Sequence, residues 1–258
     1  MSITSVTRGL LLAGGLAVAA GGSVQAAGPA VEYPSLNWSF NGVFGSYDPA
    51  ALQRGFQVYK EVCSACHGME YLAYRNLEEI GFSPQEVRAI AAEYEVEDGP
   101  DEFGDMFLRP AIPADRFRQP FPNQQAARAA NGGAYPTDLS LIAKQTKYGA
   151  NYIYAVLTGY EDEPPPDSDV TLAPGQYYNK YKGAFGMAQP LWPDSVEYAD
   201  GTPATVSQMS QDVSHFLMWA AEPHMETRKQ TGIKAIIFLL IFTGILYAVK
   251  RKVWSDLK

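Results

Sequence analysis

Two cysteines and a histidine stand within five consecutive residues of this 258-residue chain. The run reads Cys63-Ser64-Ala65-Cys66-His67, and it contains both cysteines of the sequence. This spacing is C-x-x-C-H, the pattern at which haem is attached covalently to a polypeptide. In that arrangement the two thiols bind one porphyrin and the histidine binds its iron. The pattern therefore predicts one haem c, attached through Cys63 and Cys66, with His67 as an axial ligand.

Three other interpretations of the cysteine pair are open. A redox-active dithiol needs a thioredoxin-like βαβ context, whereas Asp48 and Pro49 open a helical pattern that runs directly into Cys63. A zinc site needs four ligands, usually as two close couples. Only one close couple is present, and the histidines that could complete it are His67, His215 and His224. The third alternative is a pair of inert buried thiols, and haem is favoured over all three.

A single-haem electron carrier usually has a second axial ligand as well. The candidates are Met69, Met106, Met187, Met209, Met218, Met225, His215 and His224. Met69 follows His67 too closely to cross the ring, and methionine on a helix is ordinary core filler. Met187 lies in a Gly/Pro loop far along the chain, so it is the favoured ligand, with Met106 and His215 as alternatives. We expect His215 to be a surface residue. Ligation by His and Met implies a raised reduction potential.

The first residues are typical of an export signal. Arg8 precedes a short apolar run at 9–20, and the small residue Ala26 follows as a plausible cleavage site. The run is too short to span a bilayer. We therefore expect a signal peptide over residues 1–26, with an uncleaved anchor as the alternative, and a haem domain over 27–230 in a bacterial periplasm.

A second apolar run covers residues 231–249. Its helix would be about 28 Å long, close to the hydrocarbon core of about 30 Å. Lys250, Arg251 and Lys252 follow, and the positive-inside rule favours their location in the cytoplasm. We expect a transmembrane helix over 231–249 in the inner (cytoplasmic) membrane and a cytoplasmic tail over 250–258. A buried core helix is the alternative, but a continuous apolar surface suits lipid better.

The chain is acidic, with 28 Asp and Glu against 20 Lys and Arg. Without Arg8 and the charged residues from Lys234 onward, 27 acidic and 14 basic side chains remain, a net charge of −13. Such a field repels nucleic acid and accelerates the approach of a basic partner. The alternative is a set of solvated loops without a partner. Two clusters of acidic residues stand out: Glu93, Glu95, Glu97, Asp98, Asp101, Glu102 and Asp105; and Glu161, Asp162, Glu163, Asp167 and Asp169.

Helical patterns dominate the rest of the sequence, and no convincing set of strands is found. Asp48 and Pro49 are typical of a helix start, and Thr137-Asp138 predicts a cap for a helix that runs through Lys144. Further helices are expected over 84–94, 124–130, 151–158 and 207–221, with ordered loops over 99–122 and 161–181. The predicted fold class is mostly α, a c-type cytochrome domain with long loop insertions plus one C-terminal transmembrane helix.

Several of these segments resemble the cytochrome c1 family, the haem subunit of the cytochrome bc1 complex. The resemblance covers about residues 35–258, almost the whole chain after the predicted signal. It is carried by Arg54–Lys60 with Val62–His67, Ala73–Arg75, Asp98–Pro100, Ala126–Ala134, Asp138–Ser140, Leu157–Tyr160, Asp200–Thr205 and Trp219–Pro223.

The resemblance also implies roles for two further residues. Met187 stands where the family's Met-Ala-Pro-Pro loop begins, which implies that it is the axial methionine. Gln189 departs from that pattern but leaves the ligand in place. Arg128 matches a position that binds a haem propionate, a task that suits a guanidinium because it can pair with a carboxylate through two hydrogen bonds. A surface arginine is the alternative for Arg128.

The function implied by the resemblance is electron transfer without bond-making catalysis. Members of the family take one electron from a Rieske iron–sulfur protein and pass it to a soluble cytochrome c, in a membrane complex that includes cytochrome b. A basic cytochrome c would suit the acidic chain. The alternative in the same class is a free-standing, membrane-anchored cytochrome c that donates to a terminal oxidase. A haem enzyme or sensor with an open iron position is the rival from another class.

Overall fold

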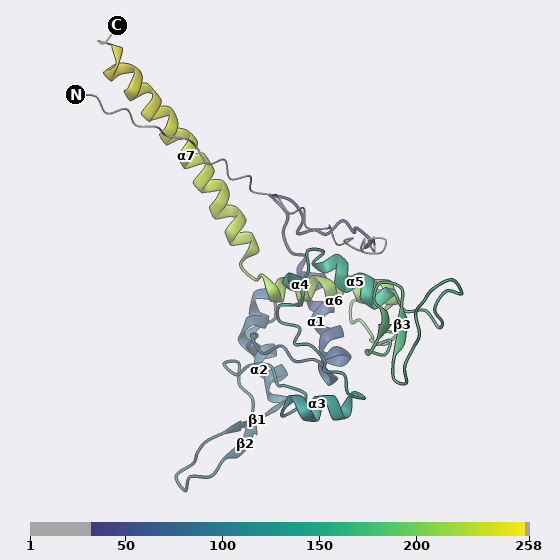
Figure 1. Ribbon diagram of the computed structural model, residues 1–258. Helices are drawn as coiled ribbons and strands as arrows, with labels where there is room; N and C mark the ends of the chain where they lie inside the picture. Colours follow the sequence, from purple (N-terminus) through teal and green to yellow (C-terminus); the bar gives the residue numbers. More distant parts are fainter. Residues whose placement is uncertain (1–31, 256–258) are drawn as a thin grey trace, which may run out of the picture. The chain divides into compact units, whose positions relative to one another are not determined.

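Helices make up most of the regular structure of residues 32–255, the part of the chain that the computed structural model describes (Figure 1). The predicted signal peptide lies outside these residues. The helices are α1 (Pro49–Glu61), α2 (Pro84–Ala92), α3 (Gln124–Ala130), α4 (Ile142–Gln145), α5 (Ala150–Thr158), α6 (Val206–Ala221) and α7 (Met225–Val253), with two 3-10 helices, η1 (Cys63–Ala65) and η2 (Tyr74–Ile80). The mostly helical fold class is confirmed.

Helices α1 and α6 make the closest helix contact of the domain, at Gly55. The predicted start of α1 is confirmed, because the Asp48 side chain accepts a hydrogen bond from the Ala50 N–H and Pro49 is the first helical residue. A Cβ atom placed on Gly55 would lie 2.0 Å from the Asp212 carbonyl oxygen of α6. Only a residue without a side chain allows the two backbones to come this close.

A buried ion pair joins the same two helices. The Arg54 Nε and Nη2 atoms each donate to the Asp212 carboxylate at 3.0 Å, and Nη1 donates to Asp200 at 2.9 Å. Asp212 is only 1% exposed. Loss of either partner would leave a buried charge without compensation, which is far more costly than the net stabilisation that the pair provides.

Two short antiparallel hairpins correct the expectation that the chain has no strands. Strand β1 (Glu95–Asp98) pairs with β2 (Phe107–Pro110), and β3 (Tyr177–Asn179) pairs with β4 (Gly183–Phe185). These strands are only three or four residues long, too short to show the sustained alternation by which strands are recognised. The first hairpin is stabilised instead by Arg109, which pairs with Asp98 across the strands and with Asp115 beyond them.

The helix expected from Thr137 to Lys144 is also largely wrong. Only α4 is helical in this region, and its N-terminal flanking residue Leu141 makes no side-chain cap. The Asp138 carboxylate binds elsewhere, accepting hydrogen bonds from the Glu70 N–H at 2.8 Å and the Ser140 N–H at 2.9 Å. The helix does not start at Asp138 because the contact to the segment after His67 takes its capping group.

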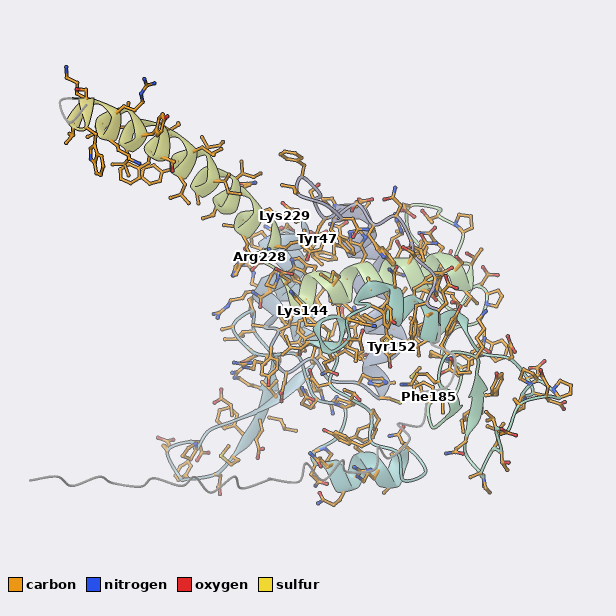
Figure 2. The ribbon with its side chains drawn as sticks, turned by 45° about the horizontal axis from the view of Figure 1, so that its top comes forward. Tyr47, Lys144, Tyr152, Phe185, Arg228 and Lys229 are labelled. Atoms are coloured by element: carbon orange, nitrogen blue, oxygen red, sulfur yellow. The ribbon has the colours of Figure 1, made fainter. Side chains whose placement is uncertain are left out.

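Helix α7 is the one helix of residues 32–255 that is long and apolar enough to cross a membrane. The mean hydropathy of its most apolar window is 2.3, and no part of that window is buried. Its first turns are attached to the domain, since Glu226 accepts the Tyr47 N–H and Arg228 pairs with Glu222. Figure 2 shows Tyr47, Arg228 and Lys229 where α7 meets the domain.

His215 is buried, which corrects its predicted surface location. It is 5% exposed, and its ring lies against those of Trp38, Phe40 and Tyr47 with centroid distances of 6.3, 4.9 and 5.9 Å. Its Nε2 atom accepts the Asp48 N–H at 3.2 Å. Burial lowers the pKa of His215, and the nearby Asp48 carboxylate opposes this effect only in part.

We expect His215 to make the domain less stable in mild acid. A histidine with a lowered pKa in the folded state contributes stability that is fully present above its ordinary pKa of about 6.5 and is lost as the pH falls below it. The free energy of unfolding should therefore decline more steeply between neutral and mildly acidic pH in the wild-type chain than in His215→Gln. Equal slopes, measured by urea unfolding, would contradict this account.

Candidate functional site

Helix α1 leads directly into the cysteine motif. The chain leaves the helix at Val62 and turns tightly, since both the Cys66 N–H and the His67 N–H donate to the Cys63 carbonyl, at 3.1 and 2.9 Å. Cys63 is half-buried and packs against the main core, whereas Cys66 is exposed. Burial raises the pKa of the Cys63 thiol to about 12. Neither cysteine is in a disulfide, so both thiols are available for attachment.

His67 is oriented by a backbone carbonyl. Its Nδ1 atom lies 2.6 Å from the Thr137 carbonyl oxygen, which can only accept, so Nδ1 carries the proton. The other ring nitrogen, Nε2, therefore has its lone pair available for a metal. Burial lowers the pKa of His67, against the opposing effects of the Thr137 contact and of Asp138. The neutral, singly protonated ring that iron ligation needs is thus the favoured form.

Asp138 fixes the position of the two segments that meet at His67. Besides the Glu70 and Ser140 N–H groups that its carboxylate binds, the Leu139 N–H donates to the Gly68 carbonyl at 2.9 Å and the Ser140 hydroxyl accepts the Tyr71 N–H at 3.1 Å. The residues after the motif are thereby bonded to residues 138–140, which keeps the Thr137 carbonyl beside the imidazole.

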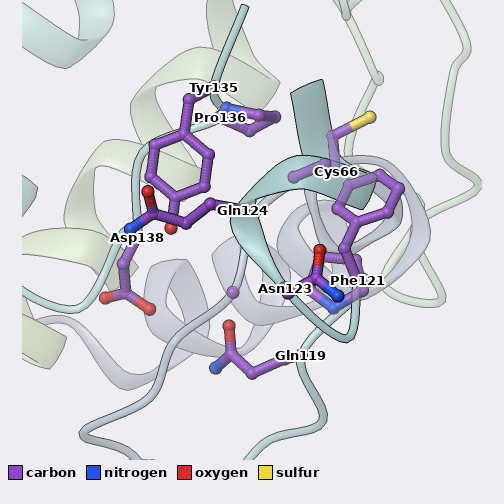
Figure 3. Close-up of a pocket in the computed structure, with 11 residues that line it drawn as sticks. Cys66, Gln119, Phe121, Asn123, Gln124, Tyr135, Pro136 and Asp138 are labelled. Atoms are coloured by element: carbon purple, nitrogen blue, oxygen red, sulfur yellow. The ribbon is translucent and has the colours of Figure 1, made fainter. Parts of the chain in front are cut away.

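An open pocket of about 140 Å³ lies beside Cys66 (Figure 3). Residues from two segments, 119–127 and 135–138, line it together with Cys66 and Gly68. The lining side chains include Gln119, Phe121, Asn123, Gln124, Tyr135 and Asp138. The sequence did not identify Tyr135 or Thr137 as residues of the site, although the segment that contains them lies between two runs with a family resemblance. The one signal in the sequence for a role at the site was that both residues lie within three positions of Asp138.

Arg128 lies on α3 and contacts the same segment. Its Nη1 atom donates to the Gly133 carbonyl at 3.0 Å, and its guanidinium carbon lies 5.4 Å from the centroid of the Tyr135 ring. The side chain is exposed. The structure therefore places an exposed cation beside an aromatic residue of the pocket, an arrangement that leaves donors available for an anionic group.

Met187 follows β4 and packs half-buried against the core that Cys63 also contacts. The Tyr160 hydroxyl donates to the Met187 carbonyl at 3.0 Å. A Cβ atom on Gly186 would lie 3.2 Å from the Ala134 Cβ, so the Met187 loop lies directly against the segment that contains Tyr135 and Thr137. Gln189 closes the loop through a hydrogen bond to the Leu191 carbonyl at 2.8 Å.

The segment 133–137 therefore contacts the surroundings of three predicted site residues. Its Gly133 carbonyl binds Arg128, its Thr137 carbonyl binds His67, and its Ala134 meets the loop of Met187. These contacts join residues that are far apart in the sequence. The arrangement fits a flat cofactor attached at Cys63 and Cys66, with nitrogen and thioether ligands supplied by separate segments.

The alternative ligands lie elsewhere. Met106 is 55% exposed in the turn of the first hairpin, Met69 and Met209 are fully buried, and Met225 packs in a separate cluster with Trp38 and Phe40. His215 contacts the start of α1, whereas the motif follows its end, about 20 Å away for a 13-residue helix. Within residues 32–255, no three His, Cys, Asp or Glu side chains converge as a metal site, so the zinc interpretation gains no support.

Comparison with known proteins gives a consistent match. Residues 38–257 match the model of the Cytochrome C1 family. A cytochrome c1 of Rhodospirillum rubrum is 45% identical over 99% of this chain and 100% of its own length. A mitochondrial cytochrome c1 heme protein of Saccharomyces cerevisiae is 46% identical over 92% of this chain and 76% of its length. A Bradyrhizobium diazoefficiens protein named cytochrome b/c1 is 48% identical over 99% of this chain, which spans 40% of that protein.

Asp138→Ala should weaken the site by removing two hydrogen bonds to backbone N–H groups. We expect a loss of about 1–3 kcal/mol in the free energy of unfolding and a smaller fraction of chains with covalently bound haem, because the Thr137 carbonyl is no longer held beside His67. Urea unfolding and the haem-to-protein absorbance ratio measure the two effects. Asp162→Ala, in an exposed loop, is the control and should change neither; an effect of equal size there would contradict the assignment.

Proposed function

The chain belongs to the cytochrome c1 family, and on this premise we propose that it is the haem-carrying electron-transfer subunit of a cytochrome bc1 complex. In finer terms, it takes one electron from a Rieske iron–sulfur protein and delivers it to a soluble basic cytochrome c, with cytochrome b as a further partner in the membrane. The relative named cytochrome b/c1 and a Candida albicans relative named as the catalytic subunit of a cytochrome b-c1 complex support this membership.

The site residues have distinct roles in this proposal. Cys63 and Cys66 would hold the haem through thioether bonds, His67 and Met187 would bind its iron, and Arg128 would pair with a propionate. The observation that carries the proposal is the orientation of His67, whose Nδ1 donates to the Thr137 carbonyl and leaves Nε2 available at the end of the cysteine motif. A solvated surface histidine would have no such fixed tautomer.

The protein's own contribution is to position and enclose the cofactor. A bound haem supplies one-electron oxidation and reduction of its iron. The Thr137 carbonyl fixes the imidazole, the Tyr160 hydroxyl fixes the backbone at Met187, and the core packing of Cys63 and Met187 limits access of water. Arg128 would provide positive charge at the edge of the haem. Without it, the propionate carboxylates would lie in a strongly acidic domain with no cation beside them.

Helix α7 is the proposed membrane anchor, with the haem domain in the periplasm and the C-terminus in the cytoplasm. Its last turn carries Lys250, Arg251 and Lys252, the charges that the positive-inside rule assigns to the cytoplasmic side. The proposed order along the chain remains a signal peptide over 1–26, a periplasmic domain over 27–230, a transmembrane segment over 231–249 and a tail over 250–258.

Acid–acetone extraction tests the covalent attachment. We expect the colour to stay with the purified protein, because thioether bonds survive conditions that release a ligated but unattached haem. Cys63→Ala with Cys66→Ala should remove the covalent haem entirely. Complete transfer of the wild-type chromophore into acetone would overturn the proposed cofactor chemistry.

Met187→Leu tests the second ligand. Leucine has similar volume but no thioether, so we expect loss of the long-wavelength absorption band of methionine-ligated ferric haem and a large fall in reduction potential. Met106→Leu, in the exposed hairpin turn, should leave both unchanged. If the spectrum of Met187→Leu matches that of the wild type while Met106→Leu changes it, the ligand assignment is wrong.

The acidic loop at 161–169 should accelerate the encounter with a basic cytochrome c. Its side chains Glu161, Asp162 and Glu163 are exposed, whereas in the other cluster Glu93 and Asp98 already pair with Lys60 and Arg109. We expect the association rate to fall at least about tenfold as the Debye length shortens from about 30 Å to about 8 Å with added salt. Stopped-flow measurements on Glu161→Gln/Asp162→Asn/Glu163→Gln should show a shallower salt dependence; an identical slope would refute the assignment to this loop.

A further inference from the structure

The loop 39–46 presents two apolar side chains beside the first turns of α7. Phe44 is 87% exposed and Val43 is 61% exposed, the former more than any other large apolar residue among residues 32–255. No charged residue occurs between Glu32 and Asp48, in a chain whose net charge is −8. An uncharged apolar tip on so acidic a protein needs an explanation in terms of what it contacts.

The loop is rigidly built, so the exposed tip is a fixed feature. The Ser46 N–H donates to the Ser39 carbonyl at 3.1 Å, the Ser39 hydroxyl donates to the Ser46 carbonyl at 2.8 Å, and the Asn41 N–H donates to the Trp38 carbonyl at 3.0 Å. Gly42 at the turn has φ +74, a left-handed conformation that favours glycine. Val43 and Phe44 therefore cannot fold back onto the core without breaking these bonds.

Contacts with α7 place this loop next to the membrane-spanning segment. Trp38 and Phe40, at its base, form a buried cluster with Met225, the first residue of α7. One turn further along the helix, the Lys229 ammonium donates to the Phe40 carbonyl at 2.7 Å and the Gly45 carbonyl at 3.0 Å. The loop thus follows α7 from residue 225 to residue 229, about 6 Å along its axis. The exposed apolar surface of α7 begins one turn later.

We propose that the tip of this loop, Val43 and Phe44, inserts into the lipid interface beside α7 as a second contact between the domain and the membrane. The occupant of this surface is the headgroup and upper acyl region of the bilayer. An apolar tip with no charge suits that region, because insertion there removes the exposed Val43 and Phe44 side chains from water without burying a charge. The inference rests on α7 crossing the membrane, as proposed above.

The consequence for the protein is control of orientation. A single transmembrane helix can tilt and rotate in the bilayer together with the domain attached to it, whereas a second membrane contact on one side of the helix restricts both movements. The Lys229 bonds transmit this restriction, because they join the loop backbone to the helix itself rather than to a flexible linker.

Site-specific photocrosslinking tests the proposal on the full chain in its own membranes. In one variant Phe44 is replaced by p-benzoylphenylalanine, and in a matched control Phe103 is replaced in the same way. Phe103 is 81% exposed in the loop between β1 and β2, the hairpin that Figure 1 shows away from α7. After illumination we expect the mass of the chain to increase by one phospholipid for position 44 and not for position 103.

Each other outcome overturns the proposal. A crosslink from position 44 to another protein would show that the tip docks on a neighbouring subunit, and the absence of any adduct would show that it faces water. Lipid adducts at both positions would show non-specific reaction. Alkaline carbonate extraction of the same membranes distinguishes a failure of the anchor from a failure of the loop proposal. A chain that carbonate releases has no membrane-spanning α7. If the chain is retained, α7 is anchored, and a missing lipid adduct at position 44 then contradicts the loop proposal alone.

Discussion

The close approach of α1 and α6 at Gly55 is the constraint on which the rest of the structure depends. It brings Arg54 to Asp212 and packs the core faces of both helices, so α1 has one fixed direction within the domain. The start of α1 then meets His215 and the base of α7, while its end delivers the cysteine motif to the opposite side. The two ends of one helix thus meet the proposed membrane anchor and the proposed cofactor site.

At the cofactor end, regular secondary structure contributes little beyond α1. The segment 133–137 is irregular, yet its carbonyls and side chains contact Arg128, His67 and the Met187 loop. Backbone carbonyls in an irregular segment are available because no helix or sheet partner uses them. Long loops with few strands are therefore well suited to a site assembled from distant parts of the chain.

The parts of the structure that follow from local chemistry could be predicted from the sequence. Asp48-Pro49 identified the start of α1 and the continuous apolar run identified α7, whereas the haem attachment predicted from C-x-x-C-H stays a prediction. The two hairpins could not be predicted, because their strands are only three or four residues long and the first depends on Arg109 pairing with Asp98 and Asp115, which no periodic pattern reveals. His215 was misplaced for a related reason: its burial depends on three aromatic residues of 38–47, which no pattern on α6 reveals.

The helix start predicted at Thr137-Asp138 was wrong for a similar reason. Its neighbours Thr137 and Ser140 suit a helix cap, but the carboxylate is used to bind the segment after His67. The local preference of these residues for a helix cap was outweighed by the tertiary hydrogen bond from the Glu70 N–H to Asp138. Conflicts between local preference and tertiary contacts are expected at functional sites. The residues that orient a ligand are harder to find than the ligand itself, because a carbonyl such as that of Thr137 leaves no signature in the side-chain sequence.

The short link between α6 and α7 has a mechanical consequence. Only Glu222, Pro223 and His224 separate the two helices, and Glu222 pairs with both Lys144 and Arg228. The cysteine motif is separated from this junction by the length of α1, about 20 Å. The three-residue link and these ion pairs fix the domain against the first turns of α7, so the cysteine motif is held at the far end of α1 from the proposed anchor, where a molecule dissolved in water has easier access than one dissolved in lipid.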